Sequence, residues 1–500
     1  MNQAKKVVLI AGVSIGLLGV TACNQNESAS NPTGEAKQSD DPISIMTILH
    51  TAEVPDQRIE EMIEEKTDTK LDIQWIPNDS YTERLNAAFA TGTLPQVVQI
   101  QHTDPFREAI RDDQFWEVGP YLDEYENLSK LNPDILENSK LDGKIYSIYQ
   151  GRPFSRMGIM YRKDWADNLG LDAPTNTDEV FEMVRAFTED DPDGNGKDDT
   201  IGLTDMSDLY YGAFKVMSSW FGTPNGWGEK DGEILPEFMF DEYLDTLNYM
   251  KSIHENGYMN QDFPVTSKTD QQNMFKSGKA GFYIGSMGDI EGIHRDAVAL
   301  NPDVEFDVHN YVEGPDGEFK TWSLPGYGSL LMFPKSSVKT EEELKKILNF
   351  YDQLMEPDTT NLLLWGVEGE HYTLEDGMAR SITENREAID REVRPYVSIE
   401  VGDAESNGRY TGFSEYPPKV KATELEKDNE KYLVQDLSIG LNSEEYIKSH
   451  DRIQDIIDDA TYKYILGQID EDGFNKAIEN WKSQGGQKII DEFSEDYQQR

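Results

Sequence analysis

Residues 43–100 read ISIMTILHTAEVPDQRIEEMIEEKTDTKLDIQWIPNDSYTERLNAAFATGTLPQVVQI, and this stretch sets the fold class. It opens on the short β-branched run Ile43–Leu49, and DQRIEEMIEEK then has apolar residues at helical spacing. KLDIQWI alternates apolar and polar residues. Apolar residues then recur at helical spacing a second time, and the stretch ends in QVVQI. The order predicts strand, helix, strand, helix and strand, which is typical of an α/β protein with a parallel or mixed sheet.

Two loops of this segment are predicted to face a ligand. Ligands of such sheets bind beyond the carboxyl ends of the strands. The loops HTAEVPDQ after Leu49 and QHTDPF after Ile100 stand at those ends. Further along, Met157–Tyr161 predicts another strand, PTNTDE offers a cap for the helix EVFEMVRAFTE, and the residues from Ser443 onward are strongly helical.

The N-terminus has the pattern of an export signal. Lys5 and Lys6 precede the largely apolar run Val7–Val20, which is too short to span a bilayer comfortably. The run ends in VTAC, and this ending resembles the lipobox of bacterial lipoproteins, which implies cleavage before Cys23 and its lipidation, palmitate included. We therefore expect a signal peptide over 1–22 and, from its polar composition, a flexible tether over 23–42. The alternative is an ordinary secretory signal followed by an incidental cysteine.

Composition restricts the possible partners. The 500 residues include 46 Lys and Arg against 95 Asp and Glu, a formal net charge of −49. This excess of carboxylates repels phosphate backbones and anionic headgroups, so we expect no nucleic-acid partner. Hydrophobic residues make up 37%, which is enough for packed cores. Cys23 is the only cysteine, which excludes an intrachain disulfide and a thiolate metal cluster.

The segment DPDGNGKDD has the spacing of a calcium-binding loop. Oxygen-bearing side chains stand at positions 1, 3, 5 and 9, in Asp191, Asp193, Asn195 and Asp199. Gly196 occupies position 6, where the loop turns sharply, and Lys197 offers its carbonyl at position 7. Position 12 is Gly202, so the usual bidentate glutamate is absent. The pattern predicts a structural Ca²⁺ site, and a solvated acidic turn is the alternative.

Several stretches resemble the extracellular solute-binding proteins of bacterial ABC importers, and especially the oligosaccharide-binding lipoprotein subgroup. The longest is YRKDWADNLGLDAPTNTDEVFEMVRAFTEDDPDGNGKDDTIGL, residues 161–203. SGKAGF (277–282), GPDGE (314–318), WGVEGEHYTLEDG (365–377) and YILGQID (464–470) support it. Their order and spacing carry the resemblance, which covers nearly the whole chain.

The resemblance implies a two-lobed periplasmic-binding-protein-like fold of type II, hinged, with a cleft between its lobes. We expect lobe 1 to take 43–155 and about 325–390, and lobe 2 to take 156–324 and about 391–500. The implied function is capture of an oligosaccharide at the outer face of the cell membrane and its delivery to the permease of an ABC transporter, by a monomer without enzymatic activity. The alginate-oligosaccharide binders of this type carry a calcium loop. Their calcium ligands, transferred position by position, imply Asp191, Asp193, Asn195, the Lys197 carbonyl, Asp199 and, in addition, Thr200 in this chain.

Aromatic residues and arginines are the candidates for sugar contact. Sugars are held by flat aromatic rings and a few polar groups. Four tryptophans lie in segments flanked by Gly or Pro, where loops are expected: Trp220, Trp227, Trp322 and Trp365. Each of them could instead pack in a core. Arg152 and Arg156, in GRPFSRMG, could bind a uronate carboxylate bidentately or simply lie exposed on a loop.

Two other functional classes remain open. A secreted glycoside hydrolase needs only two suitably spaced carboxylates, and 95 acidic residues supply many pairs. However, no stretch predicts eight repeated strand–helix units, and the single G-x-S-x-G match, Gly12–Gly16, lies in the predicted signal peptide. A calcium-stiffened adhesin would need β-sandwich repeats, which the sequence lacks.

Overall fold

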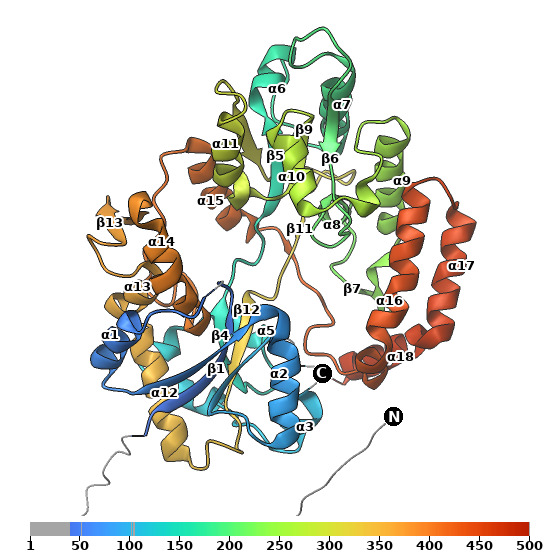
Figure 1. The fold of residues 1–500 in the computed structure, drawn as a ribbon. Helices are drawn as coiled ribbons and strands as arrows, with labels where there is room; N and C mark the ends of the chain where they lie inside the picture. Colours follow the sequence, from blue (N-terminus) through green and yellow to red (C-terminus); the bar gives the residue numbers. More distant parts are fainter. Residues whose placement is uncertain (1–40, 52, 102, 104–105, 500) are drawn as a thin grey trace, which may run out of the picture. The chain divides into compact units, whose positions relative to one another are not determined.

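Two β-sheets organise the chain in this computed structural model, which describes residues 41–51, 53–101, 103 and 106–499 (Figure 1). The predicted signal peptide, Cys23 and the tether as far as residue 40 lie outside the described residues. Strands and helices alternate along the first hundred described residues, so the predicted α/β class is confirmed.

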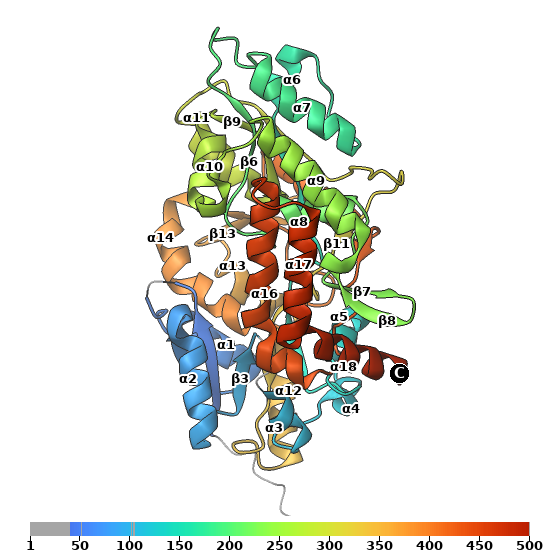
Figure 2. The same cartoon turned by 90° about the vertical axis from the view of Figure 1, so that its right-hand side faces the viewer.

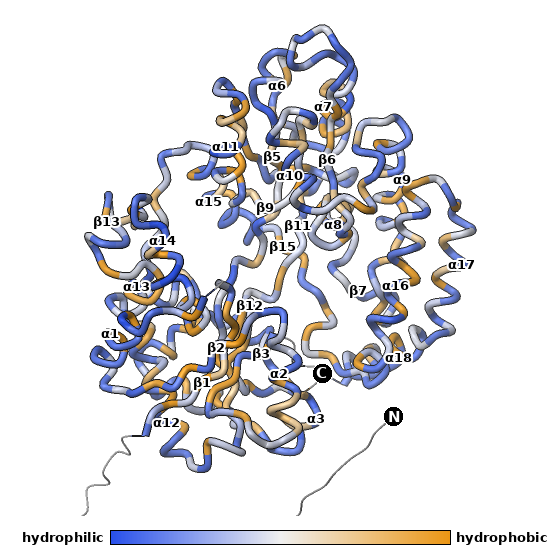
Figure 3. Tube along the Cα trace, in the orientation of Figure 1, coloured by the Kyte–Doolittle hydropathy of each residue, from blue (hydrophilic) through white to orange (hydrophobic). Residues whose placement is uncertain are grey.

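The first sheet has five strands in the order β2-β1-β3-β12-β4. They are β1 (Ile43–Leu49), β2 (Leu71–Pro77), β3 (Val97–Ile100), β4 (Ser147–Gly151) and β12 (Tyr327–Met332). β1 runs parallel to β2 and β3, whereas β12 is antiparallel to β3 and β4. Ile43 and Ile45 enter one core, and Met46 and Ile48 enter another on the opposite face. Burial of both faces explains why β1 is apolar almost throughout (Figure 3).

Helices cover this sheet and form the first lobe with it. They are α1 (Arg58–Thr67), α2 (Asn78–Thr91), α3 (Arg107–Arg111), α4 (Gly119–Leu122), α5 (Pro133–Asn138), α12 (Glu341–Leu354), α13 (Pro357–Trp365) and α14 (Arg386–Ala388). A hairpin of β13 (Tyr372–Glu375) and β14 (Met378–Ser381) follows α13. The segments 58–67 and 78–91 are thus the helices that the sequence predicts between the first three strands.

The second sheet has four strands in the order β10-β5-β9-β6. They are β5 (Met157–Arg162), β6 (Ile201–Thr204), β9 (Ala280–Ser286) and β10 (Phe306–His309). Its helices are α6 (Lys163–Leu169), α7 (Thr177–Glu189), α8 (Ala213–Trp220), α9 (Asp241–Glu255), α10 (Lys268–Lys276), α11 (Ile290–Val298) and α15 (Pro417–Asn429). As predicted, α7 begins at a cap, because the Asn176 side chain accepts a hydrogen bond from the Glu179 amide.

Three C-terminal helices pack into the core of the second lobe. They are α16 (Glu444–Ile465), α17 (Glu471–Trp481) and α18 (Gln487–Gln498), and Figure 2 shows α16 and α17 side by side. Two short strand pairs complete this lobe: β7 (Trp227–Lys230) with β8 (Glu233–Pro236), and β11 (Thr321–Trp322) with β15 (Leu433–Val434). The helical C-terminus is therefore confirmed.

Two chain crossings between the sheets run side by side. Residues 152–156 lead from β4 to β5, and residues 323–326 lead from β11 to β12. The Arg152 amide donates to the Gly326 carbonyl at 2.8 Å, and the Leu324 amide donates to the Phe154 carbonyl at 2.7 Å. These two hydrogen bonds join the crossings into a narrow ribbon, which a relative motion of the lobes must bend.

A third crossing lies after the second segment of the first lobe. Tyr396, Ile399 and Val401 pack in the first lobe's core, whereas Ala422 of α15 packs in the second lobe's. The chain therefore changes lobe between Val401 and Ala422, which is later than residue 390. None of the helices in the described part of the chain combines the length and the apolar character that crossing a membrane requires.

Candidate functional site: a cation-lined cavity between the lobes

A cavity of about 610 Å³ lies where the two lobes meet the crossing ribbon. Gln101 and Thr103 line it from the end of β3, so the loop after Ile100, predicted to face a ligand, lies on this cavity. None of the described residues of the loop after Leu49 lines this cavity. The position beyond a strand's carboxyl end follows the general rule for α/β sheets.

Opposite sides of the cavity are linked by one asparagine. The side-chain oxygen of Asn442, just before α16, accepts hydrogen bonds from Arg107 and Arg111 of α3, both at 2.8 Å. The backbone and side-chain nitrogens of Asn442 donate to Asp496 of α18 at 3.3 Å. Since Arg107 lines the cavity, these bonds connect the first lobe to the C-terminal helices at its wall.

The charges lining the cavity are mainly positive, although the chain as a whole has a net charge of −49. The charged side chains that line it, among the residues the structure describes, are Arg107, Lys140, Arg152, Arg156 and Asp436. Among the described residues, four cations thus line the cavity together with one carboxylate. Such a surface attracts anions and repels cations, against the average field of the protein.

Arg152 lies on the crossing ribbon among other charges. Its guanidinium donates to the Gly151 carbonyl at 2.8 Å and approaches Glu400 only to 4.0 Å. Glu400 is buried and is bound instead by Arg409 at 2.6 Å. Burial lowers the pKa of Arg152, and the nearby guanidiniums of Arg409 and Arg156 act in the same direction. A ligand carboxylate beside Arg152 would relieve this repulsion.

Arg156 is exposed at the end of the same crossing. Its backbone carbonyl accepts a hydrogen bond from Met287, which fixes the main chain. Its guanidinium forms no ion pair within 4.0 Å of any carboxylate in the part of the chain that the structure describes. Arg152 and Arg156 were both predicted as candidates for carboxylate binding, and the structure places both side chains on the cavity.

Two adjacent tyrosines form an aromatic surface on the second lobe. Tyr210 and Tyr211 line the cavity and are 44% and 43% exposed. The ring of Trp322 lies behind them, with centroid distances of 4.8 Å to Tyr210 and 6.2 Å to Tyr211. The backing ring orients the tyrosines while leaving them accessible, as a platform for the apolar face of a sugar requires.

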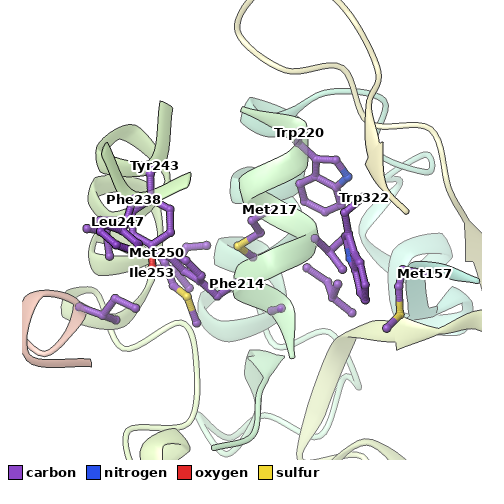
Figure 4. Packing of buried hydrophobic residues seen from close by; sticks show 14 of the residues in the cluster. Met157, Phe214, Met217, Trp220, Phe238, Tyr243, Leu247, Met250, Ile253 and Trp322 are labelled. Carbon is purple, nitrogen blue, oxygen red and sulfur yellow. The ribbon is translucent and has the colours of Figure 1, made fainter. Parts of the chain in front are cut away.

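The predicted location of the tryptophans in loops is wrong. Trp220 ends α8, Trp227 begins β7 and Trp322 lies in β11. They are 1%, 5% and 1% exposed, and Figure 4 shows Trp220 and Trp322 within the buried cluster around α8. Buried rings of this kind have no face for a sugar. Trp365 ends α13, donates to the Tyr410 carbonyl at 3.3 Å and is not among the residues lining the cavity.

Sequence reasoning missed Tyr210, Tyr211 and Asp436. The two tyrosines lie in the loop after β6, which is again the carboxyl end of a strand. The rule that identified the loop after Ile100 would therefore have found them in the second lobe. No local sequence pattern indicates that Asp436 lines a cavity, because its position there depends on the path of the chain after β15.

The candidate calcium loop follows α7 directly. The Asn195 side-chain amide donates to Asp193 at 2.8 Å and to Asp199 at 3.0 Å, so it sits between two carboxylates. One Asp191 oxygen accepts from the Gly196 amide at 2.9 Å, while the other is buried without a hydrogen-bond partner. A buried, unpartnered carboxylate oxygen is costly unless a cation binds it.

Two features limit the set of ligands that the loop can offer to a cation. Thr200 is buried and its hydroxyl donates to the Phe187 carbonyl of α7 at 2.9 Å, so this side chain is engaged with the helix rather than with the loop. Among the described residues, no three Asp, Glu, His or Cys side chains converge closely enough to hold a metal ion by themselves. The loop's donor set therefore depends on the Asn195 amide oxygen and on the Lys197 carbonyl.

Close packing explains why position 12 is glycine. A Cβ on Gly202 would lie well inside van der Waals contact of the Val184 carbonyl oxygen of α7. The Gly202 amide donates to the Thr188 hydroxyl at 2.9 Å, which holds β6 against that helix. The chain thus has no room here for the glutamate that usually completes such a loop.

We expect Gly202→Ala to lower the free energy of unfolding by about 3 kcal/mol, because the added methyl group forces β6 away from α7. Urea denaturation measures the change. Gly292→Ala in α11 is the matched control, since its Cβ would meet only the flexible end of Arg295 and alanine favours a helix. Equal losses of stability in the two variants would contradict this account of the close packing.

Two α/β lobes, an adjacent pair of crossings and a polar cavity between the lobes define a ligand-binding protein of the two-lobed type. Residues 52–351 match the family described as bacterial extracellular solute-binding protein, and the chain belongs to this family. The predicted family and two-lobed fold class are therefore confirmed.

Curated relatives extend the match to the whole chain. It is 43% identical over 505 residues, covering 100% of both chains, to the polygalacturonan/rhamnogalacturonan-binding protein YtcQ of Bacillus subtilis. It is 32% identical to Lipoprotein LipO of the same organism, covering 96% of each chain. The names of the family and of YtcQ describe binding, which favours the predicted solute-binding protein over the hydrolase.

Solved structures share the fold at low sequence identity. An HMO-binding solute-binding protein of Bifidobacterium longum infantis superimposes with a TM-score of 0.71 and 17% identity, covering 92% of this chain and 99% of that one. The alginate-binding protein AlgQ2, solved without calcium ion, gives a TM-score of 0.67 at 17% identity and the same coverage. At this identity the likeness concerns the fold alone.

Proposed function

We propose that the protein captures an acidic oligosaccharide in the cavity between its lobes and delivers it unchanged to the permease of an ABC transporter. The observation that carries this proposal is that four of the five charged side chains described on the cavity wall are cations, in a protein of net charge −49. Uronate carboxylates are the anionic groups that a sugar chain offers to arginine. The tyrosine platform of Tyr210 and Tyr211 suits the apolar face of a sugar ring.

The relatives support the same ligand class. YtcQ is named for binding polygalacturonan and rhamnogalacturonan, and AlgQ2 for binding alginate. We propose an acidic oligosaccharide for the present chain as well, because cations line its own cavity. Closure of the lobes around the ligand would bring Tyr210 and Tyr211 toward the arginines of the crossing ribbon.

The cellular setting is part of the proposal. We propose that Cys23 is lipidated after removal of 1–22, that 23–42 tethers the protein to the outer face of the membrane, and that it acts as a monomer. The lipoprotein relative LipO supports the anchor. We place lobe 1 at 43–155 and about 325–402, and lobe 2 at 156–324 and about 403–500, since Val401 packs in the first core.

We also propose a structural Ca²⁺ ion in the loop after α7. Asp191, Asp193, Asn195 and Asp199 would hold it through side-chain oxygens, and Lys197 through its carbonyl. The buried, unpartnered oxygen of Asp191 supports this site, as does a structural neighbour, FusA of Streptococcus pneumoniae, which has been solved as an EF-hand mutant. The ion would neutralise the loop's carboxylates and fix the end of α7.

Calorimetric titration of the mature chain with Cys23→Ala, which prevents acylation, tests the function. We expect oligogalacturonides to bind with a Kd of about 1 μM and neutral oligosaccharides of equal length to bind much more weakly. Chromatography of the ligand afterwards should recover it intact. Shortened products would support a glycoside hydrolase instead, and preference for the neutral sugars would contradict the proposed ligand class.

A further inference from the structure

Asp436 is the one carboxylate among the charged side chains described on the cavity wall. It follows β15, and one of its oxygens accepts hydrogen bonds from the amide and the hydroxyl of Ser438, both at 2.8 Å. Its other oxygen lies against Gly226, where a Cβ would be 2.6 Å away. Asp436 is therefore held in a fixed place at the cavity by groups that cannot neutralise it.

The surroundings of Asp436 leave its charge unbalanced. The Lys215 ammonium of α8 faces it, but Lys215 is buried in an ion pair with Glu237. Lys215 and Glu237 thus cancel most of each other's effect on Asp436. Another titratable neighbour is the phenol of Tyr210, whose pKa is raised first by burial and further by the charges of Tyr211 and Asp436.

The parts of the chain that line the cavity therefore differ in charge. Asp436 and the tyrosine platform belong to the second lobe, whereas Arg107 and Lys140 come from the first lobe, and Arg152 and Arg156 from the crossing. A fixed carboxylate accepts hydrogen bonds from sugar hydroxyls and repels a second carboxylate. A guanidinium, in contrast, attracts a carboxylate.

We propose that Asp436 makes the part of the cavity lined by the second lobe a subsite for an uncharged sugar residue and excludes a uronate from it. The cations of the first lobe and of the crossing accept the uronate, so the cavity selects a chain that mixes charged and uncharged residues over one made of uronates alone. This inference rests on the proposed function and refines it, because the carboxylate sets which residue of an acidic chain binds where.

The protonation state of Asp436 gives the proposal a specific test. Burial raises the pKa of Asp436 to about 6, although its bonds to Ser438 act in the opposite direction. Below that pH the carboxyl is neutral, while uronates, with pKa values of about 3.5 like other α-substituted carboxyls, stay ionised. Exclusion of an all-uronate chain should thus operate at pH 7.5 and disappear near pH 5.

The experiment compares two ligands of equal length on the same protein, a trigalacturonate and an oligosaccharide that alternates rhamnose with galacturonate. At pH 7.5 we expect the wild type to bind the alternating chain more tightly. Asp436→Asn should bind trigalacturonate about tenfold more tightly than the wild type does, because one repulsive charge is lost at close range. It should also lose the wild type's pH dependence between 5 and 7.5.

Two further variants separate this role from a merely structural one. Ser438→Ala removes a hydrogen bond to the ionised carboxylate, so the pH at which trigalacturonate affinity changes should move upward. Asp245→Asn removes the same charge from an exposed position of α9 outside the cavity, and should leave both affinities and the pH profile unchanged. Melting temperatures show whether each variant is folded.

The outcomes distinguish the two proposals. If the wild type binds neither acidic oligosaccharide, the proposed function fails. If it binds both, and Asp436→Asn changes neither their ratio nor the pH dependence, the function stands and the role of Asp436 is overturned.

Discussion

Arg156→Gln is expected to weaken binding of an acidic oligosaccharide by about 30-fold while leaving the stability of the protein unchanged. A charged hydrogen bond to a carboxylate contributes about 2 kcal/mol, which corresponds to this factor. Arg156 is suited to the test because its guanidinium forms no ion pair with a described carboxylate, so its removal breaks no ion pair that the structure shows. Calorimetric titration with trigalacturonate measures the effect.

The salt dependence of binding provides a second readout of the same variant. An attraction between separate charges is screened by salt, so wild-type affinity should fall between 50 and 200 mM NaCl, and less steeply in Arg156→Gln. Arg84→Gln is the matched control, since Arg84 is an exposed arginine of α2 that does not line the cavity. An unchanged Kd and salt slope in Arg156→Gln would remove Arg156 from the binding site.

Arg152 is a less informative target although it lies on the same crossing. Its amide bonds to the Gly326 carbonyl and its guanidinium to the Gly151 carbonyl, and Glu400 is within 4.0 Å. A substitution there would alter the ribbon between the lobes together with the charge of the cavity. A loss of affinity in Arg152 variants would thus combine a change of lobe motion with a lost ligand contact.

Local elements of the fold could be predicted because they follow from local spacing. The alternation in KLDIQWI gives β2, and Asn176 starts α7 by capping it. The pairing of Tyr327–Met332 with Val97–Ile100 could not be predicted from periodicity, because more than 200 residues separate the strands. Only the family resemblance placed a late segment of the chain in the first lobe.

The candidate site could be predicted in part. The loop after Ile100 and the two arginines of the crossing line the cavity, because strand ends and chain crossings have defined places in a two-lobed fold. The tryptophans could not be assigned from their Gly- and Pro-rich surroundings, since local composition does not reveal whether a neighbouring helix covers a ring. Trp322 shows the difference: it is buried, but it supports the exposed Tyr210 and Tyr211 from behind.

Removing Ca²⁺ is expected to lower the melting temperature of the protein by about 5–10 °C. An ion that binds only the folded state at 100 times its Kd adds about 2.7 kcal/mol to the free energy of unfolding. For a domain of about 200 residues each kcal/mol corresponds to about 2–4 °C. The physical cause is the loop after α7, where an Asp191 oxygen is buried without a partner unless a cation binds it.

Melting curves in EGTA and in 1 mM CaCl₂ measure this difference for the wild type and two variants. Asp191→Asn should melt at the same temperature in both solutions, because it removes a charged ligand at position 1. Asp198→Asn removes an equal charge from an exposed position of the same loop that does not carry a ligand in this register, so it should keep the full difference. If the wild type itself melts at one temperature in both solutions, the loop is a solvated acidic turn. The buried oxygen of Asp191 must then be satisfied by water or by a proton.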